Sequence, residues 1–146
     1  MLIKFQGIVI EVIDGKALLK KCGNLLTNGG QVCVEVQIAG EDKPSHMGVK
    51  MASSSEGSRL QYHSHTVSDT SLVLKQRSKL IEATTVFTAY EDCNAIRIYT
   101  EVENISEEPI TLEEVSSFVC GGIGEQGIDS AKDLYFTRFI QSHHAE

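Results

Sequence analysis

The chain has 146 residues, of which 41% are hydrophobic and 23% are charged, and its formal net charge is -7 at pH 7. A chain of this length and composition is expected to form one domain with a hydrophobic core, and disorder is not expected. The excess of carboxylates argues against binding to nucleic acid or to an anionic membrane surface, because both require clustered Lys and Arg.

The N-terminal sequence, MLIKFQGIVIEV, lacks the continuous apolar stretch and the small-residue cleavage site of a signal peptide. The chain also has no apolar run of about 18 residues, the length that a transmembrane helix requires. The cysteines show no metal-binding spacing; they are Cys22, Cys33, Cys93 and Cys120. These features predict a cytoplasmic protein with free thiols.

Apolar and polar residues alternate along most of the chain, which predicts half-buried β-strands. The alternation shifts at Gly7, where we expect a β-bulge or a bend in the first strand. Asp14-Gly15 predicts a tight hairpin turn, and Asn28-Gly29-Gly30 predicts a second turn. Short helical pieces are expected at most around Leu25 and over residues 129–132.

Residues 31–39 show the clearest alternation. One face of the expected strand carries apolar residues and should meet the core: Val32, Val34, Val36 and Ile38. The other face carries the intervening residues and should meet water: Gln31, Cys33, Glu35 and Gln37. The polar, Ser- and Gly-rich residues 41–58 that follow predict a long loop.

The segments 84–92 and 94–104 predict a second hairpin, with its turn at residues 92–94, and Pro109 opens a further strand over residues 110–115. The expected fold is an all-β antiparallel sandwich (a supersandwich), a single domain over residues 1–146 with little or no helix. We expect its core to contain Val34, Val36, Phe87, Ile96, Ile98, Val102, Leu112 and Phe136.

Several sequence patterns resemble catalytic or cofactor-binding motifs but lack the required context. The G-x-G-x-x-G run at Gly122–Gly127 follows a predicted strand over residues 116–120, but an expected strand follows it instead of the helix that a dinucleotide site needs. His143-His144, near Glu146, would face opposite sides of a strand. The many acidic residues lie at turns and on polar strand faces, and no pair of them stands out as an acid and a nucleophile. We therefore predict no catalytic residue and no cofactor-binding residue in this chain.

His63 and His65 would share one face of a regular strand, a geometry that suits a shared metal ion. Together with Gly57 and Asp69 they resemble the first motif of the cupin family. Gln76 stands where that motif requires glycine, and the second cupin motif has no counterpart. We interpret both histidines as surface residues and predict no metal; the alternative is a self-contained cupin-like protein that binds a metal or a small ligand through His63 and His65.

Residues 72–117 resemble the N-terminal domain of glycoside hydrolase family 36, the α-galactosidase (melibiase-like) family. The resemblance consists of the following residues: Thr85, Val86, Phe87, Glu91-Asp92, Ile96, Arg97, Asn104, Glu108-Pro109, Leu112, Glu113, Val115 and Ser116. The segment from Leu134 to Glu146 is similar to the stretch that precedes the linker to the catalytic domain of this family.

The resemblance implies a non-catalytic N-terminal domain packed against a downstream (β/α)₈ barrel of the same polypeptide. In this family the barrel hydrolyses terminal α-galactosides with retention of configuration, and both catalytic aspartates belong to the barrel. A homo-oligomer is also implied, and no cofactor, nucleic acid or membrane partner is expected. The region from Gly40 to Ser58 lacks the aromatic- and Asp-containing loop with which family members approach the active site.

Overall fold

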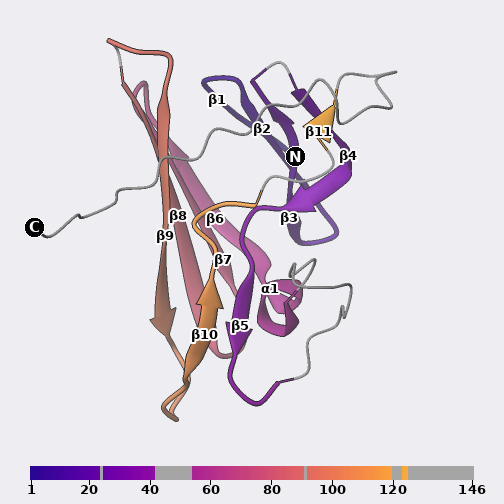
Figure 1. Cartoon of the computed structure of the whole chain (residues 1–146), viewed down its shortest axis with the longest axis vertical. Helices are drawn as coiled ribbons and strands as arrows, with labels where there is room; N and C mark the ends of the chain where they lie inside the picture. Colours follow the sequence, from indigo (N-terminus) through magenta and orange to yellow (C-terminus); the bar gives the residue numbers. More distant parts are fainter. Residues whose placement is uncertain (24, 42–53, 91, 120–122, 125–146) are drawn as a thin grey trace, which may run out of the picture.

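A computed structural model describes residues 1–23, 25–41, 54–90, 92–119 and 123–124 of the chain (Figure 1). In these residues the fold is all-β and antiparallel, as predicted, with one short helix. In chain order the elements are β1 (Leu2–Phe5), β2 (Ile8–Ile13), β3 (Lys16–Cys22), β4 (Leu25–Val32), β5 (Val36–Ile38), α1 (Ser55–Arg59), β6 (Gln61–Val67), β7 (Ser71–Arg77), β8 (Ile81–Ala89), β9 (Ile96–Asn104), β10 (Leu112–Val115) and β11 (Ile123–Gly124).

The first sheet has the strand order β1-β2-β3-β4-β11, and two tight turns begin it. Asp14 and Gly15 have φ values of 49° and 76°, so the predicted hairpin turn between β2 and β3 is confirmed. The irregularity expected at Gly7 is not a bulge or a bend within one strand: Gln6 and Gly7, with φ values of 43° and 83°, form a second turn between two separate strands. Turns with two positive φ values match the twist of the flanking strands, which explains their use here.

Strand β4 corrects two predictions. Residues 28–30 do not form a separate turn, and the residues around Leu25 are not helical; all of them belong to β4. The Asn28-Gly29-Gly30 run coincides with a register shift between β3 and β4, because Leu19 of β3 pairs with Gln31 while Lys21 pairs with Leu26. The glycine pair thus lies where β4 carries extra residues against β3, and glycine tolerates the irregular backbone of such a site.

The second sheet is a meander of strand order β6-β7-β8-β9, and its four strands lie side by side in Figure 1. The predicted hairpin is confirmed: β8 and β9 pair without a register shift from Ile81 opposite Asn104 to Ala89 opposite Ile96. Burial alternates along β7 and along most of β8. One face of this sheet therefore packs inward, as the period of two in the sequence requires.

The two larger sheets enclose a common core, which makes the fold a sandwich. Its buried residues come from both sheets and include Ile3, Phe5, Ile8, Ile10, Leu19, Leu72, Leu74, Ile81, Ala83 and Phe87. Val34, Val36 and Phe87 are buried as predicted, whereas Ile96, Ile98 and Val102 are half-buried and pack against the core. Phe136 lies outside the described residues.

Leu112 is not a core residue, and that prediction is wrong. It lies on β10, which pairs with β5 in a separate two-stranded sheet. All four residues of β10 are exposed, and Leu112 retains 39% of its accessible surface. The apolar pattern of this strand therefore does not correspond to a core-facing side in the described part of the chain.

The single strand predicted over residues 31–39 is also wrong. Strand β4 ends at Val32 and β5 begins at Val36. Cys33, Glu35 and Gln37, which alternation assigned to water, are all buried. Segments remote in the sequence contact this stretch, with Ser116 and Val119 donating backbone hydrogen bonds of 3.0 and 2.9 Å to the carbonyl groups of Glu35 and Cys33. Residues 116–119 are correspondingly not the strand that was expected ahead of the glycine run.

Helix α1 lies within the segment predicted to be a loop. Ser54 is its N-cap and accepts a 3.1 Å hydrogen bond from the backbone nitrogen of Gly57. Glu56 lies in the first turn and Arg59 in the last, which suits the helix dipole. Within the described ranges, no helix is both long enough and apolar enough to cross a membrane.

Candidate functional site

The two histidines of the cupin-like motif lie on β6, where a register shift interrupts the alternation. Tyr62 pairs with Gln76 but Ser64 pairs with Lys75, so His63 is an extra residue on the bulged strand. His63 is exposed, whereas His65 is half-buried and its Nδ1 lies 2.7 Å from the hydroxyl of Tyr62. A regular strand would place Tyr62 and His65 on opposite faces, so their contact follows from the bulge.

Other residues considered from the sequence do not meet in a site. Across the described segments, no three His, Cys, Asp or Glu side chains lie close enough together to hold a metal ion. Cys22 and Cys93 are free thiols. In the glycine run, Ile123–Gly124 forms β11 against β4, and the rest of the run lies outside the described residues together with Cys120 and His143-His144.

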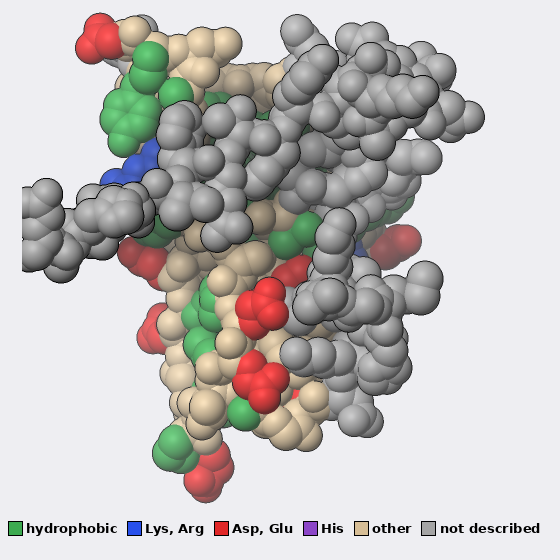
Figure 2. All heavy atoms as spheres, viewed as in Figure 1, with side chains coloured by type: hydrophobic (Ala, Val, Ile, Leu, Met, Phe, Trp, Pro, Cys, Tyr) green, Lys and Arg blue, Asp and Glu red, His purple; other side chains and the backbone are tan. Residues whose placement is uncertain are grey.

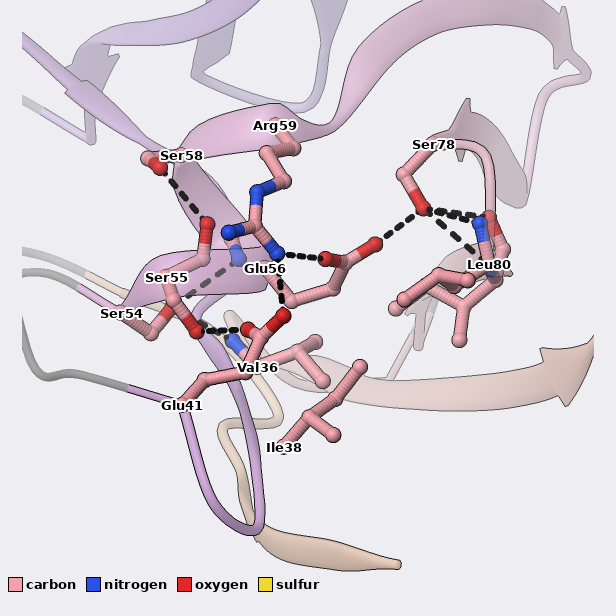
Figure 3. Close-up of polar contacts among 12 residues, drawn as sticks. Val36, Ile38, Glu41, Ser54, Ser55, Glu56, Ser58, Arg59, Ser78 and Leu80 are labelled. Carbon is pink, nitrogen blue, oxygen red and sulfur yellow. Dashed lines mark hydrogen bonds and ion pairs between the residues drawn. The ribbon is translucent and has the colours of Figure 1, made fainter. Parts of the chain in front are cut away.

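The structure instead brings together a group of polar residues around α1, none of which the sequence had singled out as a site. We call this group the α1 polar centre and define it as Glu35, Glu41, Ser54, Ser55, Glu56, Arg59 and Ser78; most of it is drawn in Figure 3. Its carboxylates come from the segments on either side of β5 and from α1, and Ser78 comes from the turn between β7 and β8. A Ser-rich run directly before an acidic residue is a helix-start signal that could have located α1.

Ser54 joins α1 to β5. Its Oγ accepts a 2.9 Å hydrogen bond from the backbone nitrogen of Val36, and its own backbone nitrogen donates to Glu35 Oε2 at 2.9 Å. The Ser54 hydroxyl also donates to this carboxylate oxygen. The helix lies so close to the residues before β5 that a Cβ on Gly57 would come within 3.1 Å of the Cα of Glu35 and closer still to Ser54 Oγ and Glu35 Oε2, so a larger residue would disturb these hydrogen bonds.

Glu56 is the most deeply placed carboxylate of the centre, with no exposed surface. Its Oε2 accepts a 2.9 Å hydrogen bond from Arg59 Nη1, and its Oε1 accepts one from the Ser78 hydroxyl. Ser78 Oγ in turn accepts hydrogen bonds of 3.0 Å from the backbone nitrogens of Leu80 and Ile81. Figure 3 shows the Glu56 side chain extended between Arg59 and Ser78. The carboxylate thus ties α1 to the β7–β8 turn.

Glu41 completes the ion-pair cluster. The hydrogen bond from the Ser55 hydroxyl, followed by that from Arg59, lowers the pKa of the Glu41 carboxyl, and hydrogen bonds to Glu41 and then to Glu56 raise the pKa of the Arg59 guanidinium. A general acid that works near neutral pH needs a raised carboxyl pKa. The shift at Glu41 has the opposite sign, so the geometry suits a charge pair that holds the fold.

A groove of about 670 Å³ lies beside the α1 polar centre, and its walls come from α1, the first residue of β6, the end of β7 and the β7–β8 turn. The lining residues are Glu56, Arg59, Gln61, Arg77, Ser78, Lys79 and Leu80. Its size falls within the range of small-molecule sites. A second groove, of about 630 Å³, lies where the β8–β9 turn meets Gln6, and its side chains include Asp69, Tyr90 and Asn94.

Arg77 of the first groove is itself held in place by Glu82. Its Nε donates to Glu82 Oε2 at 3.0 Å, and Lys75 Nζ donates to Glu82 Oε1 at 2.8 Å. These hydrogen bonds, first that from Lys75 and then those from Arg77, lower the pKa of the Glu82 carboxyl, whose side chain is 5% exposed. On the face of the molecule in Figure 2, by contrast, acidic side chains lie scattered and basic side chains are few.

No protein-family model, curated protein or solved structure matches this chain. Its function is therefore argued from the residues and contacts described above.

Proposed function

We propose that this chain is a non-catalytic β-sandwich domain of a cytoplasmic α-galactosidase-like glycoside hydrolase, in which it supports a downstream (β/α)₈ barrel. The observation that carries the proposal is that, among the described residues, those resembling glycoside hydrolase family 36 form turns and sheet contacts and do not gather around a reactive centre. Residues of this kind specify a domain fold, and a fold of this kind is what the family places ahead of its barrel.

Asn104 illustrates this role. Its Oδ1 accepts a 3.0 Å hydrogen bond from the backbone nitrogen of Ser106, and its Nδ2 donates to the carbonyl oxygen of Glu108 at 2.9 Å. Together these bonds close the turn that follows β9, directly before Pro109. An asparagine side chain that hydrogen-bonds the backbone just ahead of it is a turn-forming device.

Ser116 and Phe87 have comparable structural roles. The backbone nitrogen of Glu35 donates a 2.8 Å hydrogen bond to Ser116 Oγ, and the backbone nitrogen of Ser116 donates to the Glu35 carbonyl at 3.0 Å. Phe87 is fully buried and packs edge to face on Phe118, with ring centroids 5.6 Å apart. These residues therefore connect the segment after β10 to the core and to the residues flanking β5.

The carboxylates of the described residues support a non-catalytic role. A retaining glycosidase needs a nucleophile and an acid about 5–5.5 Å apart that flank the scissile bond. Glu41 and Glu56 share one guanidinium, and the acids of β9 and β10 lie on exposed strand positions; the latter are Glu101, Glu103, Glu113 and Glu114. This distribution supports the proposal that catalysis belongs to a separate barrel.

Exposed apolar side chains on and near β10 offer a surface for contacts with the barrel or with another subunit. Leu112 is 39% exposed, Val115 is 37% exposed and Ile105 is 38% exposed. Exposed apolar groups of this kind are often covered in an assembly. In the proposed enzyme, such contacts would stabilise the barrel or a homo-oligomer, while the α-galactoside binds to the barrel.

The proposal is tested by the release of nitrophenol from nitrophenyl α-galactoside. The complete polypeptide that contains residues 1–146, with the coding sequence read beyond Glu146, should encode a barrel and turn over this substrate. Residues 1–146 produced alone should not. Turnover by residues 1–146 alone would refute the accessory role, and a complete polypeptide without a barrel, or inactive on every α-galactoside tried, would refute the family assignment.

A further inference from the structure

We propose that the groove beside α1 binds a small ligand carrying an oxyanion, either a carboxylate or a phosphate. The inference goes beyond the proposed function and does not depend on it, because it uses only the groove residues themselves. Three observations lead to it: the positive charge of the lining, the hydrogen-bond donors of the lining that have no acceptor among the described residues, and the ion pairs that hold the two arginines in place.

The lining of the groove is positively charged in a chain of net charge -7. Arg59, Arg77 and Lys79 line it, against the single carboxylate of Glu56. The local charge stays positive when the salt-bridge partners outside the lining are included, which are Glu41, Lys75 and Glu82. A local concentration of basic groups on an acidic protein attracts anions to that place and not to the rest of the surface.

Several hydrogen-bond donors of the basic side chains in the lining have no acceptor among the described residues. Arg59 bonds both Glu41 and Glu56 through Nη1, so within the described residues its Nε and Nη2 have no acceptor. Arg77 bonds Glu82 through Nε and Nη2, which leaves Nη1 without an acceptor in the same part of the chain. Lys79 has neither an ion pair nor a hydrogen bond from its ammonium group to any described residue. A ligand that supplies several acceptor oxygens therefore complements this groove.

The guanidinium groups are fixed before any ligand arrives. Arg59 is held between Glu41 and Glu56, and Arg77 is held by Glu82, which is itself only 5% exposed. Arginine recognises carboxylates and phosphates through its planar fork, and ordering such a side chain in advance reduces the entropy lost on binding. Leu80 lies beside these cations and offers apolar surface to the body of the ligand.

The test uses the protein with three probes of similar shape: benzoate, phenyl phosphate and the neutral benzamide. Saturation-transfer NMR of the aromatic protons of each probe measures its binding. We expect saturable binding of benzoate, of phenyl phosphate or of both, and the preferred probe identifies which oxyanion the groove selects. Benzamide should bind at least about tenfold more weakly, because it lacks the charge that the arginines recognise.

Substitutions then locate the site. Lys79→Gln should weaken binding of the preferred anion at least about fivefold, and Lys79→Arg should largely retain it. Lys20→Gln is the matched control, because Lys20 lies on β3 in the other sheet, paired with Glu11 at 3.3 Å, and should leave binding unchanged. The proposal is overturned if neither anion binds below about 20 mM, if benzamide binds as well as the anions, or if Lys20→Gln and Lys79→Gln have equal effects.

Discussion

The β6–β9 sheet and the region formed by β5, α1 and β10 are stabilised in different ways. In the sheet, each strand pairs with its neighbour in the sequence, and apolar side chains alternate between the core and the outer face. In the β5–α1–β10 region, β5 pairs with a strand more than seventy residues later, and buried polar side chains connect the elements. One region depends mainly on apolar burial, and the other depends on satisfied hydrogen bonds.

This difference shows what buried polar groups require. Within the described residues, every buried side-chain nitrogen or oxygen has a hydrogen-bond partner. Glu35 and Gln37 accept hydrogen bonds from the backbone nitrogens of Ser54 and Ser55, at the start of α1. Glu56 is met by Arg59 of its own helix and by Ser78 of the β7–β8 turn. Apolar burial tolerates imperfect neighbours, whereas an unpaired buried carboxylate is costly. The β5–α1–β10 region should therefore be more sensitive to the loss of single polar atoms.

The largest effect is expected from the core of the sheet. Phe87→Ala removes a fully buried ring and its contact with Phe118, so we expect the free energy of unfolding to fall by about 3–5 kcal/mol. Val86→Ala is the control, because Val86 lies on the opposite, half-exposed face of the same strand and should cost less than half as much. Urea unfolding measures both. Equal losses would contradict the assignment of the inner face.

The next effect concerns the buried charge of the α1 polar centre. Glu56→Gln keeps the size of the side chain but removes the charge that Arg59 meets, so the free energy of unfolding should fall by about 1.5–3 kcal/mol. Glu107→Gln, on an exposed turn, should change it by less than about 0.5 kcal/mol. If the two variants unfold at the same urea concentration, the polar centre does not stabilise this region.

A smaller effect is expected at the helix cap. Ser54→Ala removes the acceptor of two backbone N–H groups, those of Val36 and Gly57, and should lower the free energy of unfolding by about 1–2 kcal/mol. Ser58→Ala is the matched control, because among the described residues the Ser58 hydroxyl donates only to the carbonyl of Ser55, one turn earlier. Hydrogen exchange should show faster opening of α1 and β5 in the first variant, with the β7–β8 hairpin unchanged. Uniformly faster exchange would mean that the two regions unfold together.

Acid should weaken both regions through different residues. The folded state lowers the carboxyl pKa of Glu82 and of Glu41 below the ordinary value of 4.5. Their contribution is therefore complete above pH 4.5 and is lost as the pH falls below it, because the unfolded chain takes up protons first. Glu82→Gln should reduce the loss of stability at acid pH that arises in the sheet. Glu41→Gln should reduce the loss that arises in the β5–α1–β10 region. Thermal unfolding between pH 3 and 7 measures the slopes, and unchanged slopes would contradict the assigned causes.

Two hairpins, one in each of the larger sheets, could be predicted from the sequence because their signals are local. The hairpin of residues 84–104 and the turn at Asp14-Gly15 follow from alternation and from residues that favour positive φ. The burial of Glu35 and Gln37 could not be predicted, since it depends on Ser54, on Ser116 and on a helix too short to have a period. The α1 polar centre was missed for the same reason. Its members are Ser, Glu and Arg residues spread along the sequence from Glu35 to Ser78, and no local pattern connects them.

We propose that the carboxylates near α1 serve the fold and that the downstream barrel of the complete polypeptide carries out catalysis. The most direct measurement is kcat for nitrophenyl α-galactoside with the complete polypeptide and with its Glu35→Gln and Glu41→Gln variants. At a temperature where all three remain folded, we expect the values to agree within about threefold, because neither side chain acts on the substrate. A loss of about a hundredfold or more in a folded variant would contradict the claim and place that carboxylate in the reaction.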